Sequence, residues 1–473
     1  MKLICYLIAS LSLAISSSEY LLVSPIHPLP DDSMSFFTHI INKNGSIIHS
    51  LSHEHYAAST PYLIDEGIVV RPCRITNTEI GGAGGRIEKI KLDGETIWKY
   101  DLNSNLGIQH HDIEPMDNGN ILCLAWEYKT QEDALNKGMI NHTGPLWSDI
   151  IVELKPIGYD SADIVWEWRA WDHIIQDIYP DLNNYVENIN DHPHKLNVNF
   201  GYSGGDGPGP PQENSDFLHI NSISYNKILD QIVFSSRKTN EIYIIDHSTT
   251  TEQASTGFDG YYNHGGDFLY RWGNRKLYTN SNDQKLYAPH SANWIDYGYP
   301  GSGNIIIFNN GVQRPGNDYS SVEEISPPLD NNGNYIFTES EALQEPVWTY
   351  DGNQDYFTSY QGGAYRLENG NTLVTITDSK DIIEVNNNGT IVWSYNWQNE
   401  GYIARAQLYK EEDIPIYILG DINDDGIIDI LDIIQMINII TSESSQDDQT
   451  ADLNNDGIIN ILDIVLLINI IIE

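Results

Sequence analysis

The sequence predicts an all-β propeller followed by a small α-helical module with two EF-hand-like calcium loops. Short strand-and-turn patterns recur through residues 40–405, and a separate segment near the C-terminus occurs twice. A short apolar leader precedes both. We therefore expect a signal peptide at residues 1–18, the propeller at 19–410 and the helical module at 411–473.

The N-terminus predicts export. Met1 and Lys2 are followed by the apolar run LICYLIASLSLAI and three serines, which is typical of a cleaved secretory signal peptide. After the leader, no apolar run reaches the roughly 20 residues that span a bilayer, so we expect no membrane span in the mature chain. The expected location is secreted, either extracellular, at the cell surface or in a periplasm.

Charge excludes one class of partner. The chain carries 67 acidic against 25 basic residues, a formal net charge of −42. Such a surface repels phosphate backbones, so we expect no nucleic-acid partner. The mature chain keeps Cys73 and Cys123, which leaves a single disulfide open as an expectation but provides no disulfide framework.

Two turn patterns predict the hairpins of propeller blades. One is an Asn/Asp-Gly turn before a β-branched or aromatic strand, and the other is an Asn-Gly-Asn turn before an apolar strand. All-β repeats tens of residues apart favour a propeller over a sandwich. We expect six blades, although the irregular spacing leaves five or seven open. The first pattern occurs at 42–51, 91–100 and 385–395, and the second at 117–126, 301–308, 331–338 and 368–376.

One segment interrupts the repeats. Residues 174–216 are rich in Asn, Asp, Gly and Pro and predict a long inserted loop. A second irregular stretch, GGAGGR at 81–86, lacks the GK[ST] end of a P-loop and predicts only a glycine-rich turn. We therefore expect no nucleotide cofactor.

The duplicated segment predicts two calcium loops. GDINDDGIIDILDII and ADLNNDGIINILDIV are offset by 31 residues, and an apolar helix follows each loop. Calcium takes six to eight oxygen ligands, and a glycine at position 6 of the loop permits its sharp turn. The expected ligands are Asp421, Asn423, Asp425, the Ile427 carbonyl, Asp429 and Asp432 in the first loop, and Asp452, Asn454, Asp456, the Ile458 carbonyl, Asn460 and Asp463 in the second. This module resembles a type I dockerin, which implies a cohesin-type protein as partner.

Four histidines stand near the starts of predicted inner strands in different blades. His110 and His111 precede one strand, while His219 and His290 open two others. Inner strands converge on the channel of a propeller, so these side chains can meet although they are far apart in sequence. Taken singly, each is explained as well by a turn cap or an inter-blade hydrogen bond, and the HHD cluster leaves a transition-metal site open.

Asn221 and Arg237 strengthen the case for a site. Alternate residues of a strand point the same way, so His219 and Asn221 share a face, and the next hairpin returns Arg237 towards them. A guanidinium offers a rigid fork of donors to oxyanions. Sulfuryl transfer, like phosphoryl transfer, spreads charge over equatorial oxygens, where such donors contribute most.

The stretches HHDIEPMDNGN, HINSISYN…IVFSSR, APHSANW and YQGGAYRLENGNTLV resemble the arylsulfotransferase (aryl-sulfate sulfotransferase) family of exported enzymes. The resemblance implies that a histidine takes a sulfuryl group from an aryl sulfate, forms a sulfohistidine and passes the group to a phenolic acceptor. It implies His290 as nucleophile, His111, His219 and Arg237 as further catalytic residues, and Asn221, His110 and Thr358 or Ser359 as substrate-binding residues.

Two other function classes stay open at this stage. One is a non-catalytic glycan-binding propeller, and the other a metal-dependent polysaccharide lyase or hydrolase, each in a dockerin-assembled extracellular complex. The extreme acidity leaves the substrate open, including sulfated polysaccharides and a role in polysaccharide catabolism. Turnover that survives chelation separates the transferase from the metal enzyme.

Overall fold

The computed structural model describes residues 19–27, 35–76, 80–104, 107–200, 216–279, 281–331, 333–336, 343–414, 420–423, 428–442, 450–454 and 456–472. The chain divides into two compact units, Met1–Glu411 and Glu412–Glu473, and each is described by itself. The predicted signal peptide lies outside the described residues.

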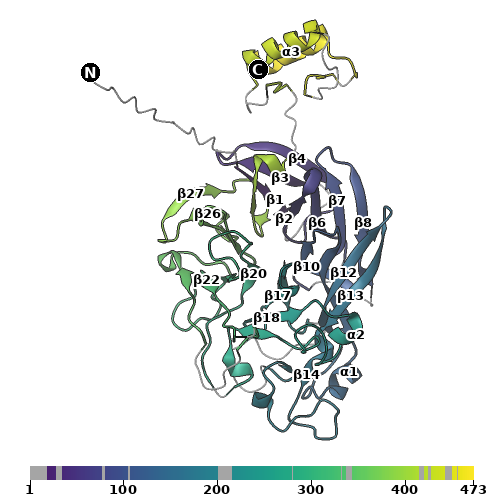
Figure 1. Ribbon diagram of the computed structural model, residues 1–473, viewed down its shortest axis with the longest axis vertical. Coiled ribbons are helices and arrows are strands. Elements are labelled where there is room, and N and C mark those ends of the chain that lie inside the picture. The colour runs from purple at the N-terminus through teal and green to yellow at the C-terminus, as the bar shows by residue number, and fades with distance from the viewer. Residues whose placement is uncertain are drawn as a thin grey trace, which may run out of the picture. The chain divides into compact units, whose positions relative to one another are not determined.

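The first unit is a six-bladed β-propeller, as predicted (Figure 1). Five blades are four-stranded antiparallel sheets, and the third has an additional short strand beside its inner strand. Each blade is given from its inner strand outwards. Blade 1 is β29 (Gln407–Lys410), β1 (Glu19–Val23), β3 (Phe36–Asn42) and β4 (Ile47–His53), and blade 2 is β5 (Tyr62–Ile64), β6 (Ile68–Arg74), β7 (Gly85–Lys91) and β8 (Thr96–Asp101). Blade 3 is β10 (Gly107–Pro115, with β9 at Asn103–Ser104), β11 (Ile121–Lys129), β12 (Leu146–Ile157) and β13 (Ser161–Arg169), and blade 4 is β16 (Ile220–Asn226), β17 (Gln231–Ser236), β18 (Glu241–Asp246) and β19 (Tyr270–Trp272). Blade 5 is β20 (His290–Trp294), β21 (Ile305–Asn309), β22 (Ser321–Ile325) and β23 (Trp348–Tyr350), and blade 6 is β24 (Gly363–Arg366), β25 (Thr372–Ile376), β26 (Asp381–Val385) and β27 (Ile391–Asn396). We number the blades 1 to 6 in this order.

The ring closes by pairing the two ends of the propeller sequence. In blade 1 the last strand, β29, pairs antiparallel with the first, β1, with Glu19 opposite Lys410 and Leu22 opposite Gln407. Close by in sequence, β2 (Pro25–Ile26) pairs with β28 (Tyr402–Ile403). The ring is therefore held shut by backbone hydrogen bonds between segments at opposite ends of the propeller sequence.

The two turn patterns mark two kinds of hairpin. Each Asx-Gly turn of the first pattern joins the third and outer strands of a blade, as between β3 and β4, β7 and β8, and β26 and β27. The second joins an inner strand to its neighbour, as between β10 and β11, β20 and β21, and β24 and β25. At 331–338 the described residues form a turn in which the Asp330 N–H donates to the Asn334 carbonyl (2.8 Å), with a bridge between Leu329 and Tyr335, and residues 332 and 337–338 lie outside the described residues.

Hydrophobic clusters fill the spaces between adjacent blades. One joins blades 3 and 4 around Trp168, Phe217 and Phe234, all nearly or fully buried. Cys73 and Cys123 are both free and buried, so the disulfide left open above does not form in this structure. Burial raises the pKa of both thiols well above the ordinary value, so neither is a ready nucleophile.

The inserted segment is only partly a loop. Residues 174–200 carry a short parallel pair, β14 (Ile174–Ile175) and β15 (Leu196–Asn197), and they bury apolar side chains in the cluster between blades 3 and 4. Two short helices, α1 (Gln131–Asn136) and α2 (Thr251–Ala254), lie in other connections, and a Thr capping box begins each. Residues 201–215 lie outside the described residues.

The second unit contains two helices, α3 (Ile430–Ser442) and α4 (Ile461–Ile472). They pack through a small apolar cluster that includes Met436 and Leu467, both fully buried. Asp432 and Asp463 are buried in the first turns of these helices at equivalent places in the repeat. The predicted helical module with duplicated loops is confirmed.

Candidate active site

Three consecutive inner strands carry a β-bulge at the same end of the propeller. The registers shift between Gln109 and Ile113 in β10, between Ile220 and Ser222 in β16, and between His290 and Asn293 in β20. Bulges leave a residue unpaired and re-aim side chains, and they are common beside active sites. The candidate histidines lie in or next to these bulges, and His111 (φ 46°) and His219 (φ 54°) adopt the left-handed conformation that is uncommon for non-glycine residues.

Asn310 determines the tautomer of His290. The Asn310 amide nitrogen donates to the Thr358 carbonyl (2.9 Å) and to the Gln361 carbonyl (2.8 Å), so its oxygen is the atom that faces the imidazole. That oxygen lies 2.7 Å from His290 Nδ1, and it can only accept. His290 Nδ1 must therefore carry the hydrogen, and the lone pair is on Nε2, which the Gln361 N–H approaches at 3.3 Å.

His290 is kept neutral. Burial is the largest cause and the Arg237 charge the next, and together they lower its pKa to about 3. At neutral pH Nε2 thus keeps its lone pair, the form in which imidazole is nucleophilic, and this lone pair accepts a long hydrogen bond from the Gln361 N–H (3.3 Å). The neutral state follows from position, because His290 is 4 % exposed.

His219 is held by a buried carboxylate that the sequence did not single out. Its Nδ1 lies 2.6 Å from one Asp216 oxygen in an ion pair, and the Lys238 ammonium lies 2.9 Å from the other oxygen. Burial opposes ionisation of Asp216, but His219 and Lys238 outweigh it and hold its pKa below the usual range. With Nδ1 occupied, Nε2 is the nitrogen of His219 left for the site.

His110 and His111 form the third side of the cluster. Their Nδ1 atoms lie 3.0 Å apart, His110 stacks on Trp126 at 4.0 Å, and the ring centroids of His111 and His219 are 4.6 Å apart. Burial lowers the pKa of His110 to about 3. The pKa of His111 is lowered by burial and then by the neighbouring rings of His219, His110 and His290, which gathers all four histidines into one cluster.

Arg237 and Asn221 lie in the same blade as His219. The Arg237 backbone N–H donates to the His219 carbonyl (3.1 Å), so the hairpin returns this arginine as the strand pattern predicts. Burial lowers the pKa of its half-buried guanidinium. Asn221 donates to the Pro289 carbonyl (2.9 Å) and accepts from Ser235 (2.6 Å), so it anchors the residue before His290.

Thr358 and Ser359 are connected to the site less directly than the residues above. The Thr358 hydroxyl donates to the Tyr360 carbonyl (2.9 Å), and the Ser359 N–H donates to Asp378 (3.1 Å). Among the described residues, neither hydroxyl hydrogen-bonds to a residue of the histidine cluster. Thr358 reaches the site only through its carbonyl, which accepts from Asn310. The structure thus links Thr358, and not Ser359, to the His290 environment.

One glycine of the 81–86 turn shapes the site. Gly82 accepts a hydrogen bond from the His111 N–H (2.7 Å), and a Cβ at Gly82 would lie 2.0 Å from the His111 ring. Its φ of 81° also favours glycine. The glycine-rich turn, which carried no functional prediction, therefore makes room for an imidazole.

The helical unit carries the predicted calcium ligands. In the second loop, Asp452 accepts from the Gly457 N–H (2.7 Å), and buried Asp463 accepts from the N–H groups of Asn454 (3.2 Å) and Asn460 (2.8 Å). The predicted donors of this loop are all oxygens, the set that suits Ca²⁺. No group of three or more His, Cys, Asp or Glu side chains is clustered as a metal site within the described part of the chain.

The first loop is described in part. Asp432 accepts from the N–H groups of Ile422 (2.7 Å) and Asp429 (2.8 Å), as Asp463 does with its own loop. The predicted ligands Asp425 and Ile427 lie outside the described residues.

Comparison with known proteins gives the family. A sequence model described as "Arylsulfotransferase (ASST)" matches residues 31–411, most of the chain. The chain belongs to the arylsulfotransferase family. A second model, the type I dockerin domain, matches residues 419–472 of this arylsulfotransferase-family protein. Both resemblances predicted from sequence are confirmed. Type I dockerins typically bind Ca²⁺, and a dockerin implies a cohesin partner in an extracellular, cellulosome-type assembly.

Solved structures are similar only at a distance. A protein of unknown function from Bacteroides caccae has 13 % identity and a TM-score of 0.44, over 84 % of this chain and 100 % of that one. A periplasmic gluconolactonase from Pseudomonas aeruginosa has 10 % identity and a TM-score of 0.42, over 83 % and 99 %. At these TM-scores the similarity carries no argument about function. No curated protein matches the chain. In the described part, no helix is both long and apolar enough to span a bilayer.

Proposed function

We propose that this arylsulfotransferase-family protein moves a sulfuryl group from an aryl sulfate to a phenolic acceptor through a sulfohistidine on His290. The proposal gives His290 the role of nucleophile and His219 the proton transfers, with His111 as a neutral ring packed against His219. Arg237 holds the oxygens of the sulfuryl group, and His110 and Asn221 maintain the arrangement of the site.

In the first half-reaction, Nε2 of His290 attacks sulfur. The N–S bond forms while the bond between sulfur and the ester oxygen breaks, and the electron pair leaves with the phenolate. A proton from His219 neutralises that phenolate, whereas His111, whose pKa burial lowers, is a neutral ring beside that of His219. Charge on the equatorial oxygens is stabilised by the guanidinium of Arg237, which already lies close enough to depress the pKa of His290.

In the second half-reaction, the acceptor phenol attacks sulfur. The O–S bond forms, the N–S bond breaks and its electron pair returns to Nε2 of His290. The phenolic proton passes to the histidine that gave one up in the first step. Proton transfer of this kind contributes roughly 10²–10⁴-fold to a rate.

One observation carries the proposal, namely the state of His290. Its Nδ1–H is fixed on Asn310, burial and the Arg237 charge keep the ring neutral, and the Nε2 lone pair makes a long hydrogen bond with the Gln361 N–H (3.3 Å). A histidine that served only to cap a turn would not need this combination.

Intact-mass spectrometry after incubation with p-nitrophenyl sulfate alone tests the proposal. We expect a sulfuryl adduct on the parent protein and its discharge when phenol is added. His290→Ala should give no adduct and still unfold at the parent temperature, whereas His55→Ala, a histidine outside the cluster, should behave as the parent. An adduct on the His290→Ala protein would show that His290 is not the nucleophile.

The dockerin supports a further part of the proposal. We infer that the enzyme is exported and attached through its dockerin to a cohesin, with one structural Ca²⁺ in each loop. Carboxylate, amide and backbone oxygens of the two loops would hold the ions, which would order the loops against the helices. No step of the transfer chemistry uses these ions, so turnover should survive chelation.

A further inference from the structure

A separate cavity of about 510 Å³ lies between the hairpins that follow three inner strands. These are the hairpins of blades 3, 4 and 5, the same blades whose inner strands carry the bulges. The residues that line it include Glu114, Tyr225, Lys227, Trp294, Asp296 and Tyr297. The volume is within the roughly 300–1,000 Å³ typical of small-molecule sites.

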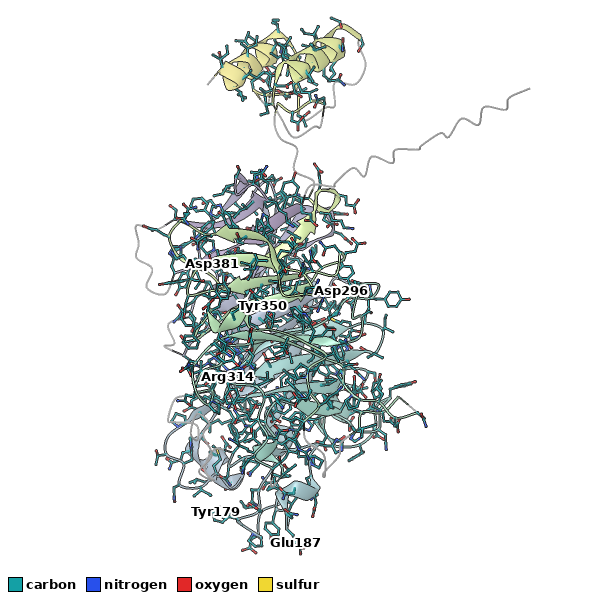
Figure 2. All side chains as sticks on the ribbon, turned by 90° about the vertical axis from the view of Figure 1, so that its left-hand side faces the viewer. Tyr179, Glu187, Asp296, Arg314, Tyr350 and Asp381 are labelled. Carbon is teal, nitrogen blue, oxygen red and sulfur yellow. The ribbon has the colours of Figure 1, made fainter. Side chains whose placement is uncertain are left out.

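The cavity and the histidine cluster are at opposite ends of the same strands. β20 begins with His290 and ends with Trp294, which is on the order of 13 Å along a strand. Figure 2 shows Asp296 and Arg314 on opposite faces of the propeller, and Arg314 follows Asn310, whose side chain holds His290. The cavity is therefore not part of the candidate active site.

Three aromatic side chains line the cavity at different depths. Trp294 is 8 % exposed, and among the described residues its buried indole N–H has no hydrogen-bond partner. Tyr225 is half-buried, and its hydroxyl donates to Asp230 (2.8 Å), which fixes the ring. Tyr297 is 81 % exposed at the rim. The cavity thus has aromatic side chains both at its rim and in its buried part, and polar side chains also line it.

The charged groups of the cavity, Lys227, Asp117 and Asp296, leave one net negative charge, which disfavours an anionic ligand. The Lys227 ammonium lies 2.7 Å from Asp117, and it opposes the rise that burial causes in the pKa of Asp296. Burial, and then Asp112, raise the pKa of Glu114 to about 8, so its carboxyl is neutral at pH 7 and can both donate and accept. An anionic ligand would meet Asp117 and Asp296, and a cationic ligand would meet Lys227.

We propose that this cavity binds a neutral sugar unit of a glycan, independently of the sulfuryl transfer at the other end of the strands. Aromatic rings pack against the apolar face of the sugar, while Glu114, Asp296 and the neighbouring amide side chains bind its hydroxyls. The propeller then has a second site in addition to its candidate active site. This second site binds uncharged carbohydrate whether or not a phenolic acceptor is present.

Isothermal titration of the full chain, in calcium and without any sulfate donor, tests the proposal. The probes are the hexaoses of β-1,4-glucan, β-1,4-xylan and β-1,4-mannan, with tetramethylammonium and a chondroitin sulfate oligosaccharide as charged comparisons. We expect at least one neutral hexaose to bind saturably at one site. Tyr297→Ala should weaken that binding at least tenfold, and Trp294→Phe should remove the fluorescence change that accompanies it.

Tyr261→Ala is the matched control, because Tyr261 is 83 % exposed and does not line the cavity. It should bind the hexaose as the parent does. The proposal is overturned if no neutral hexaose binds, if only a charged probe binds, or if Tyr297→Ala binds as tightly as the parent. Because no sulfate donor is present, a failure of the transferase proposal leaves this result unaffected.

Discussion

Asp216→Asn is expected to slow sulfuryl transfer by about 10- to 150-fold. The buried carboxylate forms an ion pair with His219 through one oxygen and with Lys238 through the other. Asparagine has one acceptor oxygen, so one of the two donors loses its partner. A hydrogen bond to a charged group is worth about 1.5–3 kcal/mol, which converts to that range of rates if it is lost at the transition state.

Steady-state turnover of two aryl sulfates measures the effect. If His219 donates a proton to the leaving phenolate, the loss must be larger for phenyl sulfate than for p-nitrophenyl sulfate, whose leaving group needs less help. Removing the competing donor in Asp216→Asn/Lys238→Met should restore part of the rate, because the single oxygen can then serve His219. Equal losses on both substrates, or a change of less than threefold, would refute the reasoning.

The remaining predictions concern the site, the cavity and the dockerin. Gly82→Ala should remove most turnover and lower the melting temperature, because its Cβ would lie 2.0 Å from the His111 ring. Gly94→Ala is the control, because Gly94 has a similar positive φ but nothing within 4 Å of an added Cβ. Equal losses of turnover in both variants would rule out the clash as the cause. Adduct formation on His290 should be constant from about pH 5 to 8, because the ring with pKa about 3 stays neutral there, and an acid limb near pH 6.5 in rapid-quench mass measurements would contradict this. Glu114→Gln should become more stable relative to the parent as the pH rises from about 4.5 to 8, because the native Glu114 carboxyl holds a proton that the unfolded chain releases. The free energies of unfolding of the two proteins, measured in urea, should diverge by up to about 1.4 kcal/mol per pH unit. Parallel curves of stability against pH would contradict this prediction. EGTA should reduce the helical circular dichroism of the full chain without reducing aryl sulfate turnover, and a loss of turnover would count against the transferase proposal.

The propeller could be predicted because its hairpins have strong local chemistry. Asx-Gly turns determine where strands reverse, and they mark hairpins in blades 1, 2, 3 and 6, whereas the β16–β17 and β17–β18 hairpins of blade 4 lack them. At residues 331–338 the Asn-Gly-Asn turn reverses the chain, but its described residues belong to no named strand of a blade. A local turn signal does not report which strand of a sheet it joins, since that depends on pairing with distant residues.

The candidate site could be predicted only in part. His219, His290 and Arg237 were found because they begin or end strands. Asn310 was not, because NNG also has the composition of an ordinary turn. Asp216 was hidden at the edge of an inserted loop, although a carboxylate three residues before a histidine was the available signal.

The bulges explain why contacts could not be predicted. A one-residue shift reverses which face of a strand a side chain occupies. Strand alternation alone therefore cannot assign orientation at the bulged ends of β10, β16 and β20. Only the register of the folded sheets does so.

The closure of blade 1 has a consequence for biosynthesis. Until residues 407–410 have been made, β1 has no inner neighbour, so its unpaired edge is available to other chains throughout export. The dockerin follows the closing strand directly, so cleavage after Lys410 would release the anchor and leave the ring complete. Cleavage a few residues earlier would instead remove the strand that joins the first and last parts of the propeller.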